Sequence, residues 1–263
     1  MTPGGDLIAT PARGTLMGNR GRLHDPARRI VRRVAGGYRA WVTCRLEFRG
    51  RHRTVMAPNR YTELFFLDEA TALAAGHRPC GECRRADYRR FKAAWLLANG
   101  ERGLGADAPI GGIDRELHRD RLDSDGRPRT YVAEIGSLPD GVFVVLPEEG
   151  GPLLVWHGTL APWSPAGYGA VQAGPRHELV RILTPRSTVA TIAGGYVPGV
   201  HTSLTGLPCE IGLAGDPASG VPAEAFQALR PPSLRKLAAR LEARGPGAPG
   251  ATGTRRSYAE WRR

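Results

Sequence analysis

The residues of this chain with the clearest chemical potential are two cysteines, Cys80 and Cys83. They belong to the run Gly-His-Arg-Pro-Cys-Gly-Glu-Cys, which begins at Gly76. Two thiolates with this spacing can occupy two corners of a tetrahedral zinc site, which a second pair of ligands normally completes. The same spacing occurs in redox proteins, but no thioredoxin-like βαβ pattern surrounds it here. The pair therefore predicts a zinc-binding module that extends from about Cys44 to Asn99.

The residues before and after this pair resemble a known zinc module. Residues 64–84 contain the runs Phe-Phe-Leu-Asp-Glu-Ala, Ala-Ala-Gly and Arg-Pro-Cys-Gly-Glu-Cys-Arg. This segment resembles the zinc-binding N-terminal domain of the Ada DNA-repair family, which ends in an aromatic strand, a short helix and Arg-Pro-Cys-x-x-Cys-Arg. The resemblance implies a bound zinc ion and a basic surface that faces DNA. It does not extend to the second half of the chain.

The chain departs from the Ada family at the first of the family's two cysteine pairs. The family's spacing would place that pair near Arg49 and Arg53, where this sequence has no cysteine. The nearest ligands are His52 and, on the preceding predicted strand, Cys44. His77 is the alternative fourth ligand, and its other possible role is packing or a hydrogen bond. We therefore expect a Cys3His zinc site formed by Cys44, His52, Cys80 and Cys83.

The missing pair also changes the function that the resemblance implies. In the Ada family one of those cysteines accepts a methyl group from a DNA phosphotriester, which requires a zinc-activated thiolate at that corner. Here arginine stands near that position, so methyl-acceptor repair does not carry over, although Cys44 could in principle replace the acceptor. We expect a structural zinc ion in a protein that acts in DNA repair, regulation or processing.

Positive charge is concentrated at the start of the chain. The net charge is +12, and residues 1–60 contain thirteen arginines and only three acidic residues. Guanidinium groups suit phosphate, and a concentrated patch gains from counterion release, so we expect a nucleic-acid partner, with DNA favoured over RNA. An acidic protein partner is the alternative. The candidate nucleic-acid-binding residues are Arg20, Arg22, Arg51, Arg53, Arg85, Arg89 and Lys92.

A second group of residues suggests catalysis. Asp114 and His118 stand four positions apart on a predicted helix, where a carboxylate could orient an imidazole as a general base or both could hold a metal. The arginines between them offer ordinary ion pairs to the same carboxylates. The alternative function is therefore a metal-dependent nuclease or another enzyme acting on nucleic acid, and whether the protein is an enzyme stays open.

The predicted fold class is α+β, with an Ada-like module followed by a small β-rich domain. The module, at 36–100, consists of a hairpin within 38–56, a strand at 64–67, a helix at 69–75, the cysteine pair and a second helix up to Asn99. A basic Gly/Arg-rich arm precedes it at 1–35. The β-rich domain, at 113–205, starts with a short helix at 114–122 and has strands at 130–135, 141–146, 153–157 and 178–183.

The remaining segment, 206–263, is rich in Pro, Gly and Ala and is expected to be a flexible tail with one basic helix at 233–243. No apolar run approaches the roughly 20 residues that span a bilayer, and no secretory signal pattern is present near the start. We therefore expect a cytoplasmic protein without a membrane partner.

Overall fold

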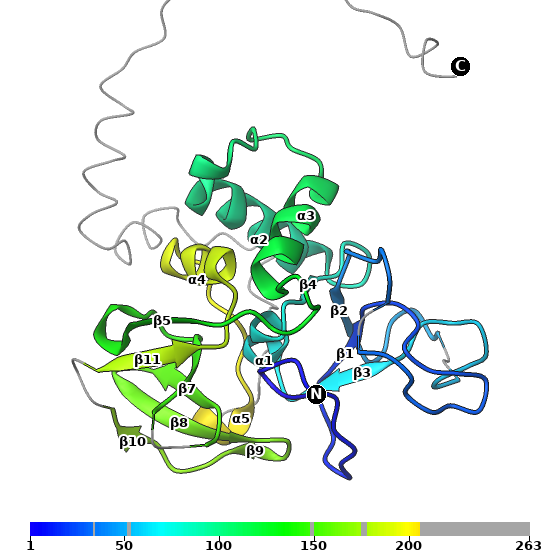
Figure 1. Cartoon of the computed structure of the whole chain (residues 1–263), viewed down its shortest axis with the longest axis horizontal. Helices are drawn as coiled ribbons and strands as arrows, with labels where there is room; N and C mark the ends of the chain where they lie inside the picture. The colour runs from blue at the N-terminus through cyan, green and yellow to red at the C-terminus, as the bar shows by residue number, and fades with distance from the viewer. Residues whose placement is uncertain (34, 52–53, 148–149, 175–177, 206–263) are drawn as a thin grey trace, which may run out of the picture. The chain divides into compact units, whose positions relative to one another are not determined.

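Two β-sheets and several helices form an α+β fold, the class that the sequence predicts (Figure 1). The computed structural model describes residues 1–33, 35–51, 54–147, 150–174 and 178–205. The predicted tail at 206–263, with its basic helix, lies outside the described residues.

The smaller sheet has four strands in the order β3-β1-β2-β4. β1 is antiparallel to β2 and to β3, whereas β2 and β4 run parallel. The strand predicted at 64–67 is confirmed as β3. The strands are β1 (Leu16–Asn19), β2 (Val42–Arg45), β3 (Leu64–Phe66) and β4 (Arg78–Pro79).

The predicted hairpin within 38–56 is wrong, because β2 pairs with β1 and β4 and not with the described residues that follow it up to Met56. Of these following residues, 46–51 and 54–56 form no strand. β1 lies in the segment 1–35, whose composition predicts an arm. Gly18 weakens the strand signal there, yet a Cβ at Gly18 would lie 2.2 Å from the ring of Phe66. Gly18 therefore weakens the strand signal of β1 in the sequence, but it is needed for the packing of β1 against Phe66.

Helix α1 (Glu69–Ala74) confirms the short helix predicted at 69–75 and carries clear signals at both ends. Asp68 caps its start, since the Asp68 carboxylate accepts a 2.8 Å hydrogen bond from the backbone N–H of Thr71. At its end both backbone hydrogen bonds of a Schellman motif are formed. Gly76 supplies the left-handed residue of this motif, with φ of +79°. The turn leads the chain directly into β4 and Cys80.

Helix α2 (Arg85–Ala98) confirms the helix predicted after the cysteine pair. Its residues Phe91 and Trp95 are buried against α1 and against helix α3 (Ile110–Arg121). The 3-10 helix η1 (Gly100–Arg102) lies in the connection between α2 and α3. α3 confirms the short helix predicted in this region and begins four residues before the predicted start. The aromatic positions that predict α2 therefore form its buried face.

The larger sheet has seven strands, in the order β10-β8-β7-β6-β11-β5 with β9 paired to β8. The four strands predicted in this region are confirmed as β5 (Tyr131–Glu134), β6 (Phe143–Val145), β7 (Leu153–Trp156) and β11 (Leu179–Ile182). Those not predicted are β8 (Thr159–Ser164), β9 (Gly167–Tyr168) and β10 (Gln172–Ala173). The remaining short elements are η2 (Ile135–Ser137), α4 (Arg186–Ala193) and α5 (Thr202–Thr205).

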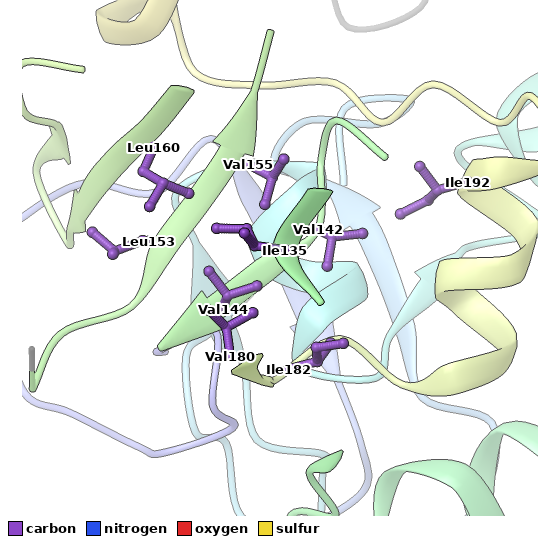
Figure 2. Packing of buried hydrophobic residues seen from close by; sticks show 9 residues of the cluster. All are labelled: Ile135, Val142, Val144, Leu153, Val155, Leu160, Val180, Ile182 and Ile192. Carbon is purple, nitrogen blue, oxygen red and sulfur yellow. The ribbon is translucent and has the colours of Figure 1, made fainter. Parts of the chain in front are cut away.

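Aliphatic side chains from the larger sheet form the main core cluster. In β11 the alternation of exposed and buried residues places Val180 and Ile182 on the inner face. Ile192 of α4 closes one side of the cluster. Figure 2 shows these side chains together: Ile135, Val142, Val144, Leu153, Val155, Leu160, Val180, Ile182 and Ile192.

Helix α1 lies between the two sheets (Figure 1) and joins them through a second apolar cluster. Ala70 and Ala74 of α1 pack with Phe143 and Leu154 of the larger sheet. The Tyr168 hydroxyl also donates a 2.7 Å hydrogen bond to Asp68, the residue that caps α1. The described residues accordingly belong to one compact unit, which takes in the described parts of both segments predicted as separate domains.

Candidate metal centre

Three cysteines from different parts of the sequence meet beside the smaller sheet. Cys44 lies in β2, Cys80 follows β4, and Cys83 precedes α2. The parallel register pairs Thr43 with Pro79, so the next residue on each strand is a cysteine. The three Sγ atoms all lie within 4.8 Å of one another. Because thiolates are metal ligands, this cluster could hold a metal ion.

Backbone amides point at the sulfur atoms of this cluster. The N–H of Glu82 donates to Cys80 Sγ at 3.4 Å, and the Cys83 amide also favours the Cys80 thiolate. The amide of Arg45 acts on Cys83 in the same way. Such second-shell hydrogen bonds orient the ligands of metal sites and stabilise their anionic form.

The three thiols do not ionise equally. Hydrogen bonds from Cys44, and to a lesser extent from Cys83, lower the pKa of Cys80. The pKa of Cys44 is raised, mainly by its hydrogen bond to Cys80 and to a lesser extent by the one to Cys83. One thiolate is thus stabilised by the protons that its neighbours keep. A metal cation could replace those protons, because metal binding deprotonates its cysteine ligands.

The sequence offers two candidates for a fourth ligand, His52 and His77. His52 lies outside the described residues. His77 is buried away from the three thiols, with its ring 5.1 Å from that of Trp41 and 4.8 Å from that of Phe66. Its Nδ1 lies 3.0 Å from the carbonyl oxygen of Ala75, so Nδ1 carries the proton and donates. His77 thus packs against aromatic rings and forms a hydrogen bond. This is the role that the sequence analysis gave as the alternative to metal binding.

A cleft of about 640 Å³ opens beside the cluster. Cys80 is half-buried, whereas Cys44 and Cys83 are buried, so Cys80 is the thiol that meets the cleft most directly. Charged and aromatic side chains line the cleft together with the cysteines, among them Phe48, Arg51, Arg60, Tyr61, Glu63 and Glu82.

Buried Arg84, which the sequence predictions omit, holds the cysteine loop to the rest of the fold. Its guanidinium donates to Glu69 of α1 at 2.6 Å, to Thr43 of β2 at 2.6 Å and to Asp87 of α2 at 3.0 Å. Thr43 precedes Cys44 and Arg84 follows Cys83, so one side chain connects both sides of the site. The arginine that ends the Cys-x-x-Cys-Arg run is the sequence signal that could have identified it.

The basic residues of α2 form an outward row, which we call the basic face: Arg85, Arg89 and Lys92. Arg85 and Arg89 are exposed and Lys92 is half-buried, on a side of α2 that adjoins the one carrying Phe91 and Trp95. Within the described ranges, no ion pair joins the basic face to a carboxylate. The basic face is therefore free to meet an external anion.

The other predicted nucleic-acid-binding residues are dispersed. Arg22 is exposed and donates a 2.8 Å hydrogen bond to Asn59. Arg51 is exposed and pairs with Glu82 beside the cleft. Arg20 is only 2% exposed, so its guanidinium does not face the solvent. Arg53 lies outside the described residues.

Asp114 and His118 share helix α3, but neither hydrogen bond nor ion pair joins them in the described structure. Both Asp114 carboxylate oxygens accept from Arg78, at 2.7 and 2.8 Å. His118 Nδ1 lies 2.9 Å from a guanidinium nitrogen of Arg121. Each of the two is engaged with a different arginine, so this geometry does not favour the enzyme alternative.

Comparison with known proteins finds no match to this chain among family models, curated proteins or solved structures. The resemblance to the Ada zinc module therefore remains a prediction. Among the described helices, none is long and apolar enough to cross a membrane.

Proposed function

We propose that this protein binds DNA through the basic face of α2 and that a structural zinc ion holds this helix in place. The observation that carries the proposal is the order of the elements: the three-cysteine cluster is followed at once by α2. The basic face then presents three cations without carboxylate partners in the described chain. Such a row can contact successive phosphates, in DNA repair, regulation or processing.

The choice of zinc follows from the donor set. Thiolates favour zinc, copper(I) and iron–sulfur clusters, and Cys3His is an established ligand set of structural zinc sites. Cys44, Cys80 and Cys83 would supply three corners. We keep His52, the prediction from the sequence, for the fourth. A site closed by four protein ligands leaves no open position for a substrate, which makes its role structural.

Zinc would act on the basic face through short connections. Cys83 is two residues before Arg85, the first residue of α2. Arg84 lies between them and binds Asp87 of the same helix. An ion that fixes Cys83 would therefore also fix the first turn of α2 and the direction in which Arg85 points.

The test measures binding of zinc-loaded protein to a fluorescent DNA duplex by anisotropy at several salt concentrations. One variant replaces the whole basic face with glutamine: Arg85→Gln, Arg89→Gln and Lys92→Gln. A control variant removes the same charge from exposed arginines elsewhere: Arg115→Gln, Arg127→Gln and Arg181→Gln. Zinc content is measured on each sample.

For the wild type, the logarithm of the binding constant should fall linearly with the logarithm of salt concentration. The basic-face variant should lose about one unit of this slope for each phosphate contact removed, and the control variant should keep the slope. Equal losses in both variants would reject the basic face as the contact surface. DNA binding that is unchanged after zinc removal would reject the structural role of the metal.

A further inference from the structure

Two arginines, Arg20 and Arg121, are buried against the ring of Trp41. Arg20 follows β1 and Arg121 ends α3, and their exposed fractions are 2% and 4%. The guanidinium carbon of Arg20 lies 4.9 Å from the centroid of the Trp41 ring, and that of Arg121 lies 3.8 Å from it. Trp41 thus brings two buried cations into one region of the interior.

The acidic residues that act on these two cations already have partners. The negative charge of Asp6 raises the pKa of Arg20, but Asp6 forms its ion pair with Arg33, at 3.0 Å. The negative charge of Asp114 raises the pKa of Arg121, but Asp114 forms its ion pair with Arg78, at 2.7 Å. In the part of the chain that the structure describes, no ion pair joins a carboxylate to either buried arginine. The region therefore carries positive charge that the carboxylates of the described residues offset only in part.

The hydrogen-bond donors of the two arginines are also incompletely used. The hydrogen bonds that Arg20 makes within the described residues are two contacts of 3.5 Å to the carbonyl of Gly5, longer than normal. Arg121 donates to the carbonyls of Gly76 and Arg39 at 2.9 and 2.7 Å, and a guanidinium nitrogen also lies 2.9 Å from His118 Nδ1. The Nε atom of each arginine is buried and has no hydrogen-bond partner among the residues that the structure describes. Burial is the main cause that lowers the pKa of Arg20 to about 10 and that of Arg121 to about 9.

Both side chains line one small cavity of about 30 Å³. The loop at Gly4 and Gly5 also lines it, as do Trp41 and, from an exposed position, Arg129. A cavity needs roughly 10 to 15 Å³ of this kind of volume to hold one water molecule. The space therefore suits about two water molecules or one small ion, but no organic ligand.

We propose that this cavity is a binding site for a small inorganic anion of the size of chloride, held between Arg20 and Arg121. The anion accepts hydrogen bonds from the two free Nε–H groups and offsets the buried positive charge. A water molecule can accept these hydrogen bonds, but it does not neutralise charge, and the cation–π contacts with Trp41 recover only part of the desolvation penalty. The site is independent of the metal centre and of DNA binding.

The test uses chloride and bromide as probes on the full chain. Thermal unfolding is followed while sodium chloride replaces sodium gluconate at constant ionic strength, so that general salt effects stay fixed. Arg20→Met removes the cation with the weaker hydrogen bonds and keeps an aliphatic side chain of similar reach. The control is Arg115→Met, on the exposed side of α3. Separately, crystals of the wild-type protein are soaked in sodium bromide and examined for anomalous scattering.

We expect the melting temperature of the wild type to rise by a few degrees and then to saturate, as for a ligand that binds only the folded state. The Arg115→Met variant should show the same rise, and the Arg20→Met variant should lose it. A bromide peak should lie between the two guanidinium groups. An unsaturable rise, an equal rise in Arg20→Met, or a cavity that contains only water in the bromide soak would each overturn the proposal. If Arg20→Met does not fold, the bromide soak of the wild type decides.

Discussion

The guanidinium of Arg84 donates a 2.6 Å hydrogen bond to the carboxylate of Glu69 in the interior of the fold. Glu69 begins α1, and Arg84 directly follows Cys83. The same carboxylate accepts a 2.7 Å hydrogen bond from the hydroxyl of Tyr196, which follows α4. One buried carboxylate therefore connects the central helix, the cysteine loop and the segment between α4 and α5.

Replacing Arg84 tests how strongly this connection stabilises the fold. Arg84→Met would leave Glu69 and Asp87 buried without their shared guanidinium, and breaking one side of a buried ion pair costs about 3 to 5 kcal/mol. Urea unfolding measures the loss. The control is Arg85→Met at the next, exposed position, which should change the free energy of unfolding by no more than about 0.5 kcal/mol. Similar small changes in both variants would contradict a stabilising role for Arg84.

Removing one thiol tests the metal centre. Cys44→Ser should reduce the zinc content of the purified protein from about one ion per chain to near zero, because binding needs all the ligands to converge. Elemental analysis by mass spectrometry measures this content. The control is Met17→Leu, which changes a sulfur-containing side chain in the same cluster without removing a ligand. A Cys44→Ser protein that keeps its zinc would show that Cys44 is not a ligand.

The glycine that ends α1 should be sensitive to a single added methyl group. At Gly76, a Cβ would meet Arg121 Cδ at 2.7 Å, and φ is +79°. Gly103 has a similar φ of +74°, but a Cβ there has nothing within 4 Å. Gly103→Ala therefore reports the cost of the left-handed backbone, about 1 to 2 kcal/mol. Gly76→Ala should lower the free energy of unfolding by more than Gly103→Ala does. Equal losses would mean that the Arg121 side chain can move away from the added methyl group at little energetic cost.

Buried His77 predicts that the fold becomes less stable in acid. Burial is the main cause that lowers its pKa well below 6.5, and the positive charges of Arg20 and Arg121 add to the effect. The unfolded chain takes up a proton near pH 6.5, whereas the folded protein does not, so the free energy of unfolding falls as the pH drops below about 6.5. This single group contributes at most about 1.4 kcal/mol per pH unit.

Urea unfolding between about pH 7 and about pH 5 measures this dependence. His77→Leu should show a shallower decrease, because it has no imidazole to protonate in the unfolded chain. The control is His157→Asn at an exposed position, where the left-handed φ of +48° is one that asparagine tolerates. The control should keep the wild-type slope. Parallel curves for wild type and His77→Leu would assign the acid sensitivity to other groups.

Local sequence signals predict the elements that they directly encode. Asp68 and Gly76 mark the two ends of α1, and the spacing of Phe91 and Trp95 marks the buried face of α2. These signals depend on backbone hydrogen bonds and side-chain positions within a few residues. β8, β9 and β10 lack such a signal, because Pro162 interrupts the alternation of β8 and because β9 and β10 have only two residues each.

Strand partners and buried charges were decided by the tertiary structure. β2 pairs with β1 and β4, which local alternation does not encode, and the hairpin predicted from that alternation is wrong. Composition likewise groups Arg20 with the surface arginines, although β1 carries it into the interior beside Trp41. A charged side chain becomes internal only when distant segments close over it.

The sequence by itself identified Cys80 and Cys83 as a candidate metal-binding pair, because a spacing of two residues lets two thiolates approach one ion. The sequence also predicted Cys44 as a ligand and left His77 as an alternative, but only the tertiary structure shows that Cys44 lies beside the pair and that His77 does not. The parallel pairing of β2 with β4 places Cys44 beside Cys80 across 36 residues of sequence, and the turn after α1 directs His77 into the core. Contacts between distant residues form only when the whole chain folds.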